Sequence, residues 1–200
     1  MIDPKSIARQ FAQRVRNKLA FEWMAEASVR AQERVLAMPE FQSAQTVALY
    51  RARPREVATD LLIAACRAAK KDVLLPAWAK DRDAYGFVRW PEESPLRPGH
   101  YGIEEPVELR WVPGAQVDFA VVTALSFDPY GFRLGHGGGH FDRLLADTAG
   151  FKLCLAFECQ KVTAVPTDSH DVPVDAVVTE KALYRAPARL LYADPHELKK

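Results

Sequence analysis

The chain has 200 residues, of which 48% are hydrophobic, enough to bury one core in a single domain over residues 1–200. Lysine and arginine number 27 against 26 aspartates and glutamates, a formal net charge of +1 without a long basic block, so DNA or RNA is not an expected partner. No run of about 18 apolar residues could span a bilayer, and residues 1–5 lack a basic-then-apolar leader pattern, so we expect a cytoplasmic protein without a membrane partner.

The first element is predicted to be a long amphipathic helix. Asp3 and Pro4 have the residue types of a helix N-cap followed by proline at the first helical position. Apolar residues then recur every four positions, at Ile7, Phe11, Val15 and Leu19. We expect this helix to be broken once before Pro39.

A β-α-β pattern follows. Residues 46–50 (TVALY) and 72–78 (DVLLPAW) are short apolar runs typical of buried strands, and residues 57–70 between them have helical periodicity. Residues 80–113 carry five prolines and only scattered apolar stretches. We predict little regular structure for that region and place it over the edge of the sheet.

The second half of the chain repeats the alternation. Residues 117–125 (VDFAVVTAL) predict a strongly buried strand, 141–149 a short helix, and 152–158 and 174–179 two more strands. Together these elements predict an α/β fold, a three-layer, Rossmann-like sandwich with a largely parallel sheet.

One segment stands out as a candidate site. Residues 127–143, called here the glycine segment, contain five of the ten glycines together with two arginines and two aspartates. Glycines let backbone N–H groups approach an anion closely, arginine adds fixed positive charge, and a helix starting at about Phe141 would point its positive end at the same place. Because the segment follows the strand 117–125, it falls at the carboxyl edge of the sheet, where ligands of such folds bind. The pattern predicts a phosphate-binding site.

Three known glycine motifs fit less well. A Walker A loop would need lysine and a hydroxyl residue after its last glycine, where His140 and Phe141 stand, and the dinucleotide-binding fingerprint would open the first β-α unit. The tetrapeptide HGGG (136–139) also occurs as an oxyanion motif in lipases and esterases. An acyl hydrolase would need a GxSxG elbow, however, and Ser169 has no flanking glycines.

The residues 131–143, GFRLGHGGGHFDR, resemble the G-x-R-L-G-x-G-x-G-[YF]-[YF]-D-R segment of 5-formyltetrahydrofolate cyclo-ligases, also called methenyltetrahydrofolate synthetases. Further matches to this family occur in the family's order. They are Lys5 with Arg9, Tyr50 with Glu56, YGIEEP (101–106), AFECQ (156–160) and HDVPVD (170–175).

The resemblance implies an enzyme. It would convert 5-formyltetrahydrofolate to 5,10-methenyltetrahydrofolate with ATP and Mg²⁺, releasing ADP and phosphate, and would act as a monomer or weak dimer. Such a reaction requires a phosphate site, cations on the developing charge, a divalent metal and a pocket for a flat pterin.

The resemblance also implies a role for each matching residue. Lys5 and Arg133 would be catalytic, the carboxylates of Asp142 and Asp171 would hold Mg²⁺, and reduced folate would be bound by Tyr50, Glu56, Tyr101 and His140. The implied ATP site comprises Lys5, Arg9, Arg133, Leu134, Gly135, His136, Gly137, Gly138, Gly139, His140 and Phe141.

The sequence departs from the family pattern at three places. His140 stands where the family has the first aromatic residue of its pair, Thr123–Ala124 replace a proline and a glycine, and Ala77 stands where an arginine usually follows Leu-Pro. An alternative hypothesis is therefore a diverged nucleotide- or folate-binding relative that acts on another substrate or on none.

Overall fold

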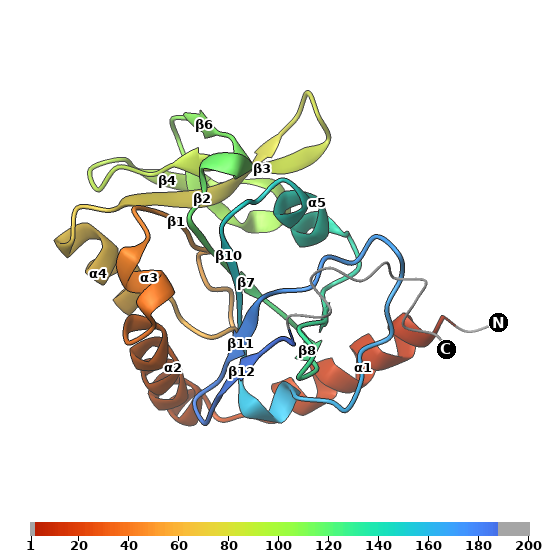
Figure 1. The fold of residues 1–200 in the computed structure, drawn as a ribbon. Helices are drawn as coiled ribbons and strands as arrows, with labels where there is room; N and C mark the ends of the chain where they lie inside the picture. The colour runs from red at the N-terminus through yellow and green to blue at the C-terminus, as the bar shows by residue number, and fades with distance from the viewer. Residues whose placement is uncertain (1–2, 188–200) are drawn as a thin grey trace.

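The structure is a computed structural model that describes residues 3–187. Its centre is an eight-stranded sheet with the strand order β12-β11-β10-β7-β1-β2-β3-β6 (Figure 1). The strands are β1 (Thr46–Ala48), β2 (Asp72–Ala79), β3 (Ala84–Arg89), β6 (Trp111–Val112), β7 (Phe119–Thr123), β10 (Phe151–Leu155), β11 (Ala176–Val178) and β12 (Leu183–Arg185).

The middle of the sheet is parallel and its edges are antiparallel. β1 pairs in parallel with β2 and β7, and β10 pairs in parallel with β7 and β11. The three antiparallel pairings join β12 to β11, β3 to β2, and β6 to β3. The predicted α/β fold with a largely parallel sheet is therefore confirmed, and its central strands lie where the sequence placed them, with ends shifted by up to three residues.

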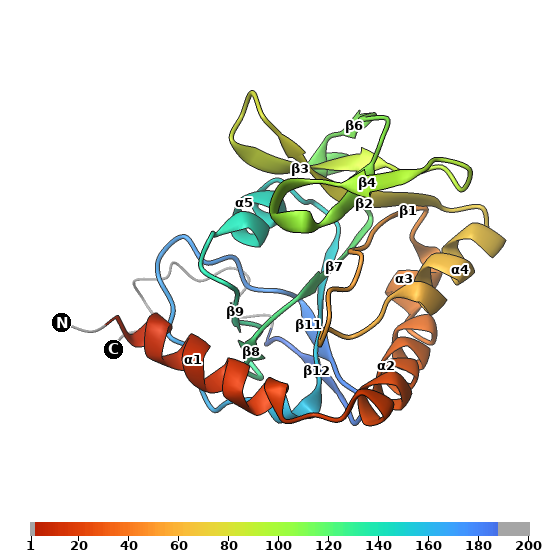
Figure 2. The ribbon, with the colours of Figure 1, turned by 180° about the vertical axis from the view of Figure 1, so that it is seen from behind.

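Helices cover both faces of the sheet. α2 (Phe21–Leu36), α3 (Pro39–Ser43) and α4 (Asp60–Ala68) lie on one face, and α5 (His140–Ala146) lies on the other (Figures 1 and 2). A separate hydrophobic core lies on each face of the sheet, because successive side chains of a strand point to opposite faces. In β7, Phe119 and Val121 pack toward α2, α3 and α4, while Ala120 and Val122 pack toward α5. This is the predicted three-layer sandwich.

α1 (Pro4–Asn17) begins as predicted. The Asp3 carboxylate accepts hydrogen bonds from the backbone N–H groups of Lys5 at 3.0 Å and Ser6 at 3.1 Å, which caps the helix. The predicted break falls at residues 18–20, where α1 ends and α2 begins. The first part of the predicted apolar stripe is not buried, since Ile7 and Phe11 remain 56% and 63% exposed, whereas Val15 and Leu19 are half-buried. The helix lies against the turn that follows β10, and the only residues it buries are Ala12 and Arg16.

The prediction of little regular structure in residues 80–113 is wrong. β3 and β6 extend the main sheet, and β4 (Leu96–Pro98) pairs with β5 (Glu104–Pro106) in a separate two-stranded sheet. The five prolines fall in connections or on these short edge strands, where a missing N–H costs no interior hydrogen bond. β3 pairs with β2, which lies outside residues 80–113, and β6 then pairs with β3, so the local sequence of this region does not reveal that it joins the main sheet.

Two further features complete the description of the chain. β8 (Ser126–Phe127) and β9 (Arg133–Leu134) form a small antiparallel pair that brackets the first part of the glycine segment. Within the described residues, no helix is long and apolar enough to cross a membrane. The prediction of a single domain extends over residues 188–200, which lie outside the described part, and it stays a prediction.

Candidate active site

A cavity of about 1150 Å³ lies at the carboxyl edge of the sheet, between α1, the glycine segment and the loop at residues 168–171. In Figure 2 the chain leaves β9 close to α1 and runs up to α5, so the glycine segment extends along this edge from the neighbourhood of α1 to α5. All the site residues predicted from the sequence line the cavity: Lys5, Arg9, Tyr50, Glu56, Tyr101, Arg133, Leu134, Gly135, His136, Gly137, Gly138, Gly139, His140, Phe141, Asp142 and Asp171. The structure thus brings together residues from five separate stretches of the chain, 5–9, 50–56, 101, 133–142 and 171.

The glycine segment has a backbone that other residues would adopt with strain. Gly137 has φ +109° and Gly139 has φ +61°, both in the left-handed region that favours glycine. Gly135 differs, because a Cβ added there would meet no atom within 4 Å. Its α-carbon therefore borders open space, which is what close approach of a ligand to the backbone requires.

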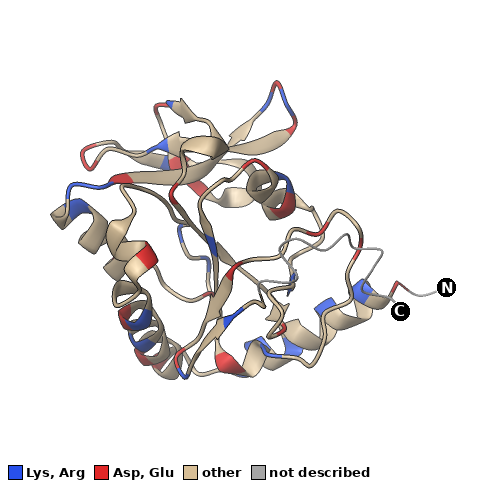
Figure 3. Ribbon diagram, viewed as in Figure 1, with Lys and Arg blue, Asp and Glu red and all other residues tan. Residues whose placement is uncertain are grey.

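Basic residues recur along α1 (Figure 3), and two of them reach the cavity. The Arg9 guanidinium donates to the Gly135 carbonyl at 3.1 Å, and the Lys5 ammonium forms ion pairs with Asp168 at 2.8 Å and Asp171 at 2.5 Å. Partial burial opposes the charge of Lys5, but the hydrogen bonds to these two carboxylates outweigh it and raise the pKa of the amine. These contacts attach α1 to the glycine segment on one side of the cavity and to the loop at residues 168–171 on the other.

Arg133 occupies the inner wall. Its side chain is only 3% exposed and is paired with the Asp142 carboxylate at 2.8 Å, and it also donates to the Val172 carbonyl. The Val172 N–H donates in turn to Asp142 at 3.2 Å. This ring of contacts sets Asp142 beside the chain segment that carries Asp171, so the two predicted metal ligands lie in neighbouring positions.

The carboxylates do not by themselves form a metal cage. Among residues 3–187, no cluster of three or more histidine, cysteine, aspartate or glutamate side chains could hold a metal ion. Magnesium, however, is commonly held by one or two carboxylates together with water and substrate phosphates. Asp142 and Asp171 fit that mode, each with one oxygen held by a cation of the protein.

Tyr50 and Glu56 form the floor near the exit of β1. Tyr50 lines the cavity although it is only 3% exposed, and its hydroxyl donates to the Val57 carbonyl at 2.7 Å. Glu56 accepts from the Arg53 N–H at 2.8 Å, and burial raises the pKa of its carboxyl group. Burial lowers the pKa of the His136 imidazole, and the nearby positive charges of Arg16, Arg53 and Arg9 lower it further.

The sequence did not single out an aromatic cluster at the other end of the cavity. Its members, called here the aromatic wall, are Trp78, Tyr85, His100, Tyr101 and His140. Trp78 and Tyr85 are cross-strand partners in β2 and β3, and the His100 ring stacks on Trp78 with centroids 3.9 Å apart. A hairpin prediction for residues 72–89 would have paired Trp78 with Tyr85, but the approach of the other three residues depends on tertiary structure.

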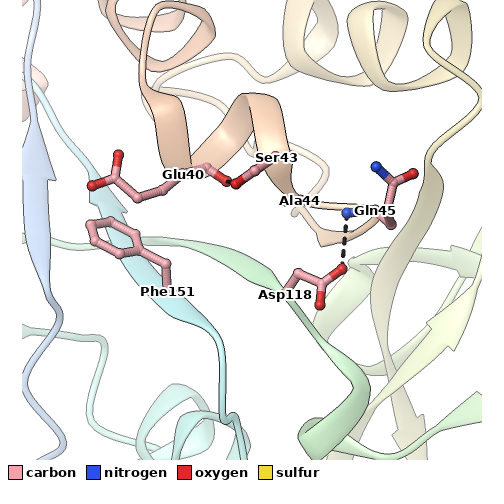
Figure 4. Close-up of a pocket in the computed structure, with 6 residues that line it drawn as sticks. All are labelled: Glu40, Ser43, Ala44, Gln45, Asp118 and Phe151. Carbon is pink, nitrogen blue, oxygen red and sulfur yellow. Dashed lines mark hydrogen bonds between the residues drawn. The ribbon is translucent and has the colours of Figure 1, made fainter.

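A second hollow of about 410 Å³ lies at the opposite, amino edge of the sheet (Figure 4). Asp118 accepts hydrogen bonds there from the backbone N–H groups of Gln45 and Thr46, and Glu40 is paired with Arg185 at 2.7 Å. These polar groups connect elements of the fold. No glycine and no arginine is among the residues that line this hollow, in contrast to the larger cavity.

Known proteins match this chain over a range that includes all the predicted site residues. The sequence profile described as the 5-formyltetrahydrofolate cyclo-ligase family matches residues 2–180. The 5-formyltetrahydrofolate cyclo-ligase of Escherichia coli K12 is 31% identical over 175 residues, which cover 84% of this chain and 96% of that protein. The chain belongs to the 5-formyltetrahydrofolate cyclo-ligase family.

Solved structures agree with this assignment. A 5,10-methenyltetrahydrofolate synthetase of Aquifex aeolicus superposes with a TM-score of 0.82 at 33% identity, covering 94% of this chain and 93% of that one. A second synthetase, from Mycoplasma pneumoniae, has a TM-score of 0.72 at 19% identity and shows the shared fold, covering 89% of this chain and 99% of that one. The resemblance drawn from the sequence is confirmed, as is the expectation that the chain is an enzyme of the ligase class.

The positions that depart from the cyclo-ligase pattern lie in different surroundings. His140 belongs to the aromatic wall, and burial together with Arg143 and His100 lowers the pKa of its imidazole. Thr123 and Ala124 line the cavity at the end of β7. Ala77 is completely buried and is not among the lining residues. Two of the three departures of this cyclo-ligase family member therefore face the site.

Proposed function

We propose that this protein converts 5-formyltetrahydrofolate to 5,10-methenyltetrahydrofolate in a reaction that consumes ATP, requires Mg²⁺ and releases ADP and phosphate. The observation that carries the proposal is the single cavity in which the glycine segment, two cationic residues of α1 and two carboxylates converge in a member of this family. The formyl oxygen attacks the γ-phosphoryl group and ADP leaves. N10 then closes the ring at the former formyl carbon, which releases that oxygen as phosphate.

The protein contributes position and charge to this chemistry. Backbone N–H groups of the glycine segment and the side chains of Lys5, Arg9 and Arg133 surround the phosphates and neutralise charge in the transition state. Arg133 uses one N–H for Asp142 and one for Val172, which leaves three of its five N–H donors. Bound between Asp142, Asp171 and the phosphates, Mg²⁺ would neutralise further charge on the transferring group.

Folate recognition occupies the rest of the cavity. Glu56 accepts hydrogen bonds from the pterin, and the rings of Tyr50, Tyr101 and His140 pack against its flat surface. A side-chain nucleophile is not needed, since the formyl oxygen itself attacks. The second candidate is a relative that binds nucleotide without this turnover, and it is favoured by the presence of His140, Thr123 and Ala124 in the site.

Replacing Gly135 with alanine tests the phosphate site. The new methyl group meets no protein atom within 4 Å, so the free energy of unfolding should change by less than about 0.5 kcal/mol. The methyl group does occupy the space through which phosphate reaches the backbone, and KM for ATP should rise about tenfold or more. Steady-state kinetics give the result, with KM for the folate as the internal control. An unchanged KM for ATP would remove Gly135 from the phosphate site.

Replacing Asp171 with asparagine tests the metal site. The Mg²⁺ concentration for half-maximal activity should rise about tenfold or more, because the amide supplies a neutral ligand in place of a carboxylate. Asp168→Asn is the matched control, since Asp168 also pairs with Lys5 but is 57% exposed and is not a predicted ligand. If both variants shift the Mg²⁺ requirement equally, Asp171 acts only through Lys5.

A further inference from the structure

The turn that carries Tyr101 has an unusual backbone. Called here the Tyr101 turn, it comprises residues 99–103, between β4 and β5. Tyr101 has φ +55°, a left-handed conformation that is uncommon for residues other than glycine, and the residue is 62% exposed while lining the cavity. The surrounding structure must hold a residue in this conformation, because the intrinsic preference of the backbone opposes it.

A buried carboxylate packs against the Tyr101 turn. Glu105 is 5% exposed and accepts two hydrogen bonds, one at 3.1 Å from the Trp78 N–H of β2 and one at 3.1 Å from the Arg97 guanidinium of β4. The same carboxylate packs against Gly99, where an added Cβ would lie 2.4 Å from its Cδ and Oε2 atoms. Only glycine allows the turn to approach Glu105 this closely.

The contacts of Glu105 connect the turn to the aromatic wall. Trp78, whose N–H is bound by Glu105, carries the ring on which His100 stacks. Tyr85 donates from its hydroxyl to the His100 carbonyl at 3.1 Å, one residue before Tyr101. Glu105 therefore hydrogen-bonds to β2 and β4 and packs against the Tyr101 turn, and it is not among the residues that line the cavity.

We infer that Glu105 is a positioning residue, which does not line the cavity but holds the Tyr101 turn so that the Tyr101 ring is in place for the flat ring of the substrate. The inference deepens the proposed function and, as far as it concerns the substrate, rests on it. It differs from a general structural role in predicting an effect that passes through Tyr101.

Glu105→Gln is the test variant. The amide keeps the shape of the side chain but has one acceptor oxygen, so either the Trp78 N–H or the Arg97 guanidinium then faces an NH₂ group. In the parent protein the Gly102 and Ile103 amides of the Tyr101 turn are hydrogen-bonded. In the variant they should exchange with deuterium at least about tenfold faster than in the parent, while the amides of β7 and β10 stay protected. Glu108→Gln, which changes an exposed carboxylate paired with Arg110, is the matched control and should leave exchange unchanged.

A double-mutant cycle with Tyr101→Ala tests the link to the substrate. In the parent, Glu105→Gln should raise KM for 5-formyltetrahydrofolate about tenfold while kcat stays within about threefold. In the Tyr101→Ala background the same change should alter KM by no more than about twofold, because the ring that Glu105 positions is gone. Equal effects in both backgrounds, or unchanged exchange in the Tyr101 turn, would overturn the inference. Absence of folate turnover in the parent would count against the proposed function, whereas the exchange result would still decide whether Glu105 holds the turn.

Discussion

Replacing Arg133 with alanine should lower the turnover number at least about tenfold, since one charge-assisted contact in the transition state is worth about 1.5–3 kcal/mol. Arg133 lines the cavity next to the glycine segment, and three of its N–H donors remain after its contacts with Asp142 and Val172. A fixed guanidinium at this place stabilises negative charge that develops on the transferring phosphoryl group. Initial rates at saturating ATP and folate measure the effect.

The burial of Arg133 makes a loss of stability part of the same result. Removing a side chain that is 3% exposed leaves Asp142 without its ion-pair partner, which should lower the free energy of unfolding by about 1–3 kcal/mol. Turnover must therefore be expressed per folded molecule, from urea unfolding under the assay conditions. Arg133→Lys is the matched control, because it keeps the charge and should recover part of both losses. A turnover number within about twofold of the parent for the folded alanine variant would exclude Arg133 from the mechanism.

The largest expected effect on stability comes from replacing Gly150 with alanine. A Cβ at this position would lie 2.2 Å from the carbonyl oxygens of both Val117 and Asp118, far inside van der Waals contact with backbone that cannot rotate away. The neighbouring Phe151 N–H donates to the Asp118 carbonyl at 2.8 Å, so relief of the clash would disturb the pairing of β10 with β7. We expect the free energy of unfolding to fall by about 3 kcal/mol.

Urea denaturation of the alanine variant measures this loss. Gly135→Ala is the control, since it makes the same change where no atom lies within 4 Å and should leave the unfolding midpoint unchanged. A loss below about 1 kcal/mol at Gly150 would mean that β7 and β10 separate at their ends at little cost, contrary to the hydrogen bond from Phe151 to Asp118 and the pairing of the two strands.

The central strands were predictable because each is a short apolar run that is buried on both faces. In β7, alternate residues contribute to two separate cores, and a continuous hydrophobic run such as VDFAVVTAL reflects this directly. The strands β3 to β6 were missed because the prolines of the segment indicated a loop. Only β3 has its partner, β2, outside the segment, whereas β6 pairs with β3 and β4 pairs with β5 as strands of two or three residues, too short to give a clear apolar pattern. The exposure of Ile7 and Phe11 was also hidden, since a periodic apolar stripe does not reveal whether a partner surface exists.

The site was predictable where chemistry follows from local sequence. The glycines, Arg133 and Asp142 lie within one segment, and the resemblance to the cyclo-ligase family added Lys5, Tyr101 and Asp171, all of which line the same cavity. Trp78, Tyr85 and His100 were missed because three separate elements bring their rings together. Glu105 was hidden for a different reason, since its hydrogen bonds to Trp78 and Arg97 exist only when β2 and β4 are in place.

The most direct test of the proposed function follows the absorbance of the conjugated methenyl product. The purified protein is incubated with 5-formyltetrahydrofolate, with ATP and Mg²⁺ present and with each omitted in turn. The proposal predicts product only when both are present, together with one ADP for each methenyl group formed. Bound nucleotide without product, or product formed without ATP, would contradict it, and the former would identify a binding relative in which His140, Thr123 and Ala124 have changed the site.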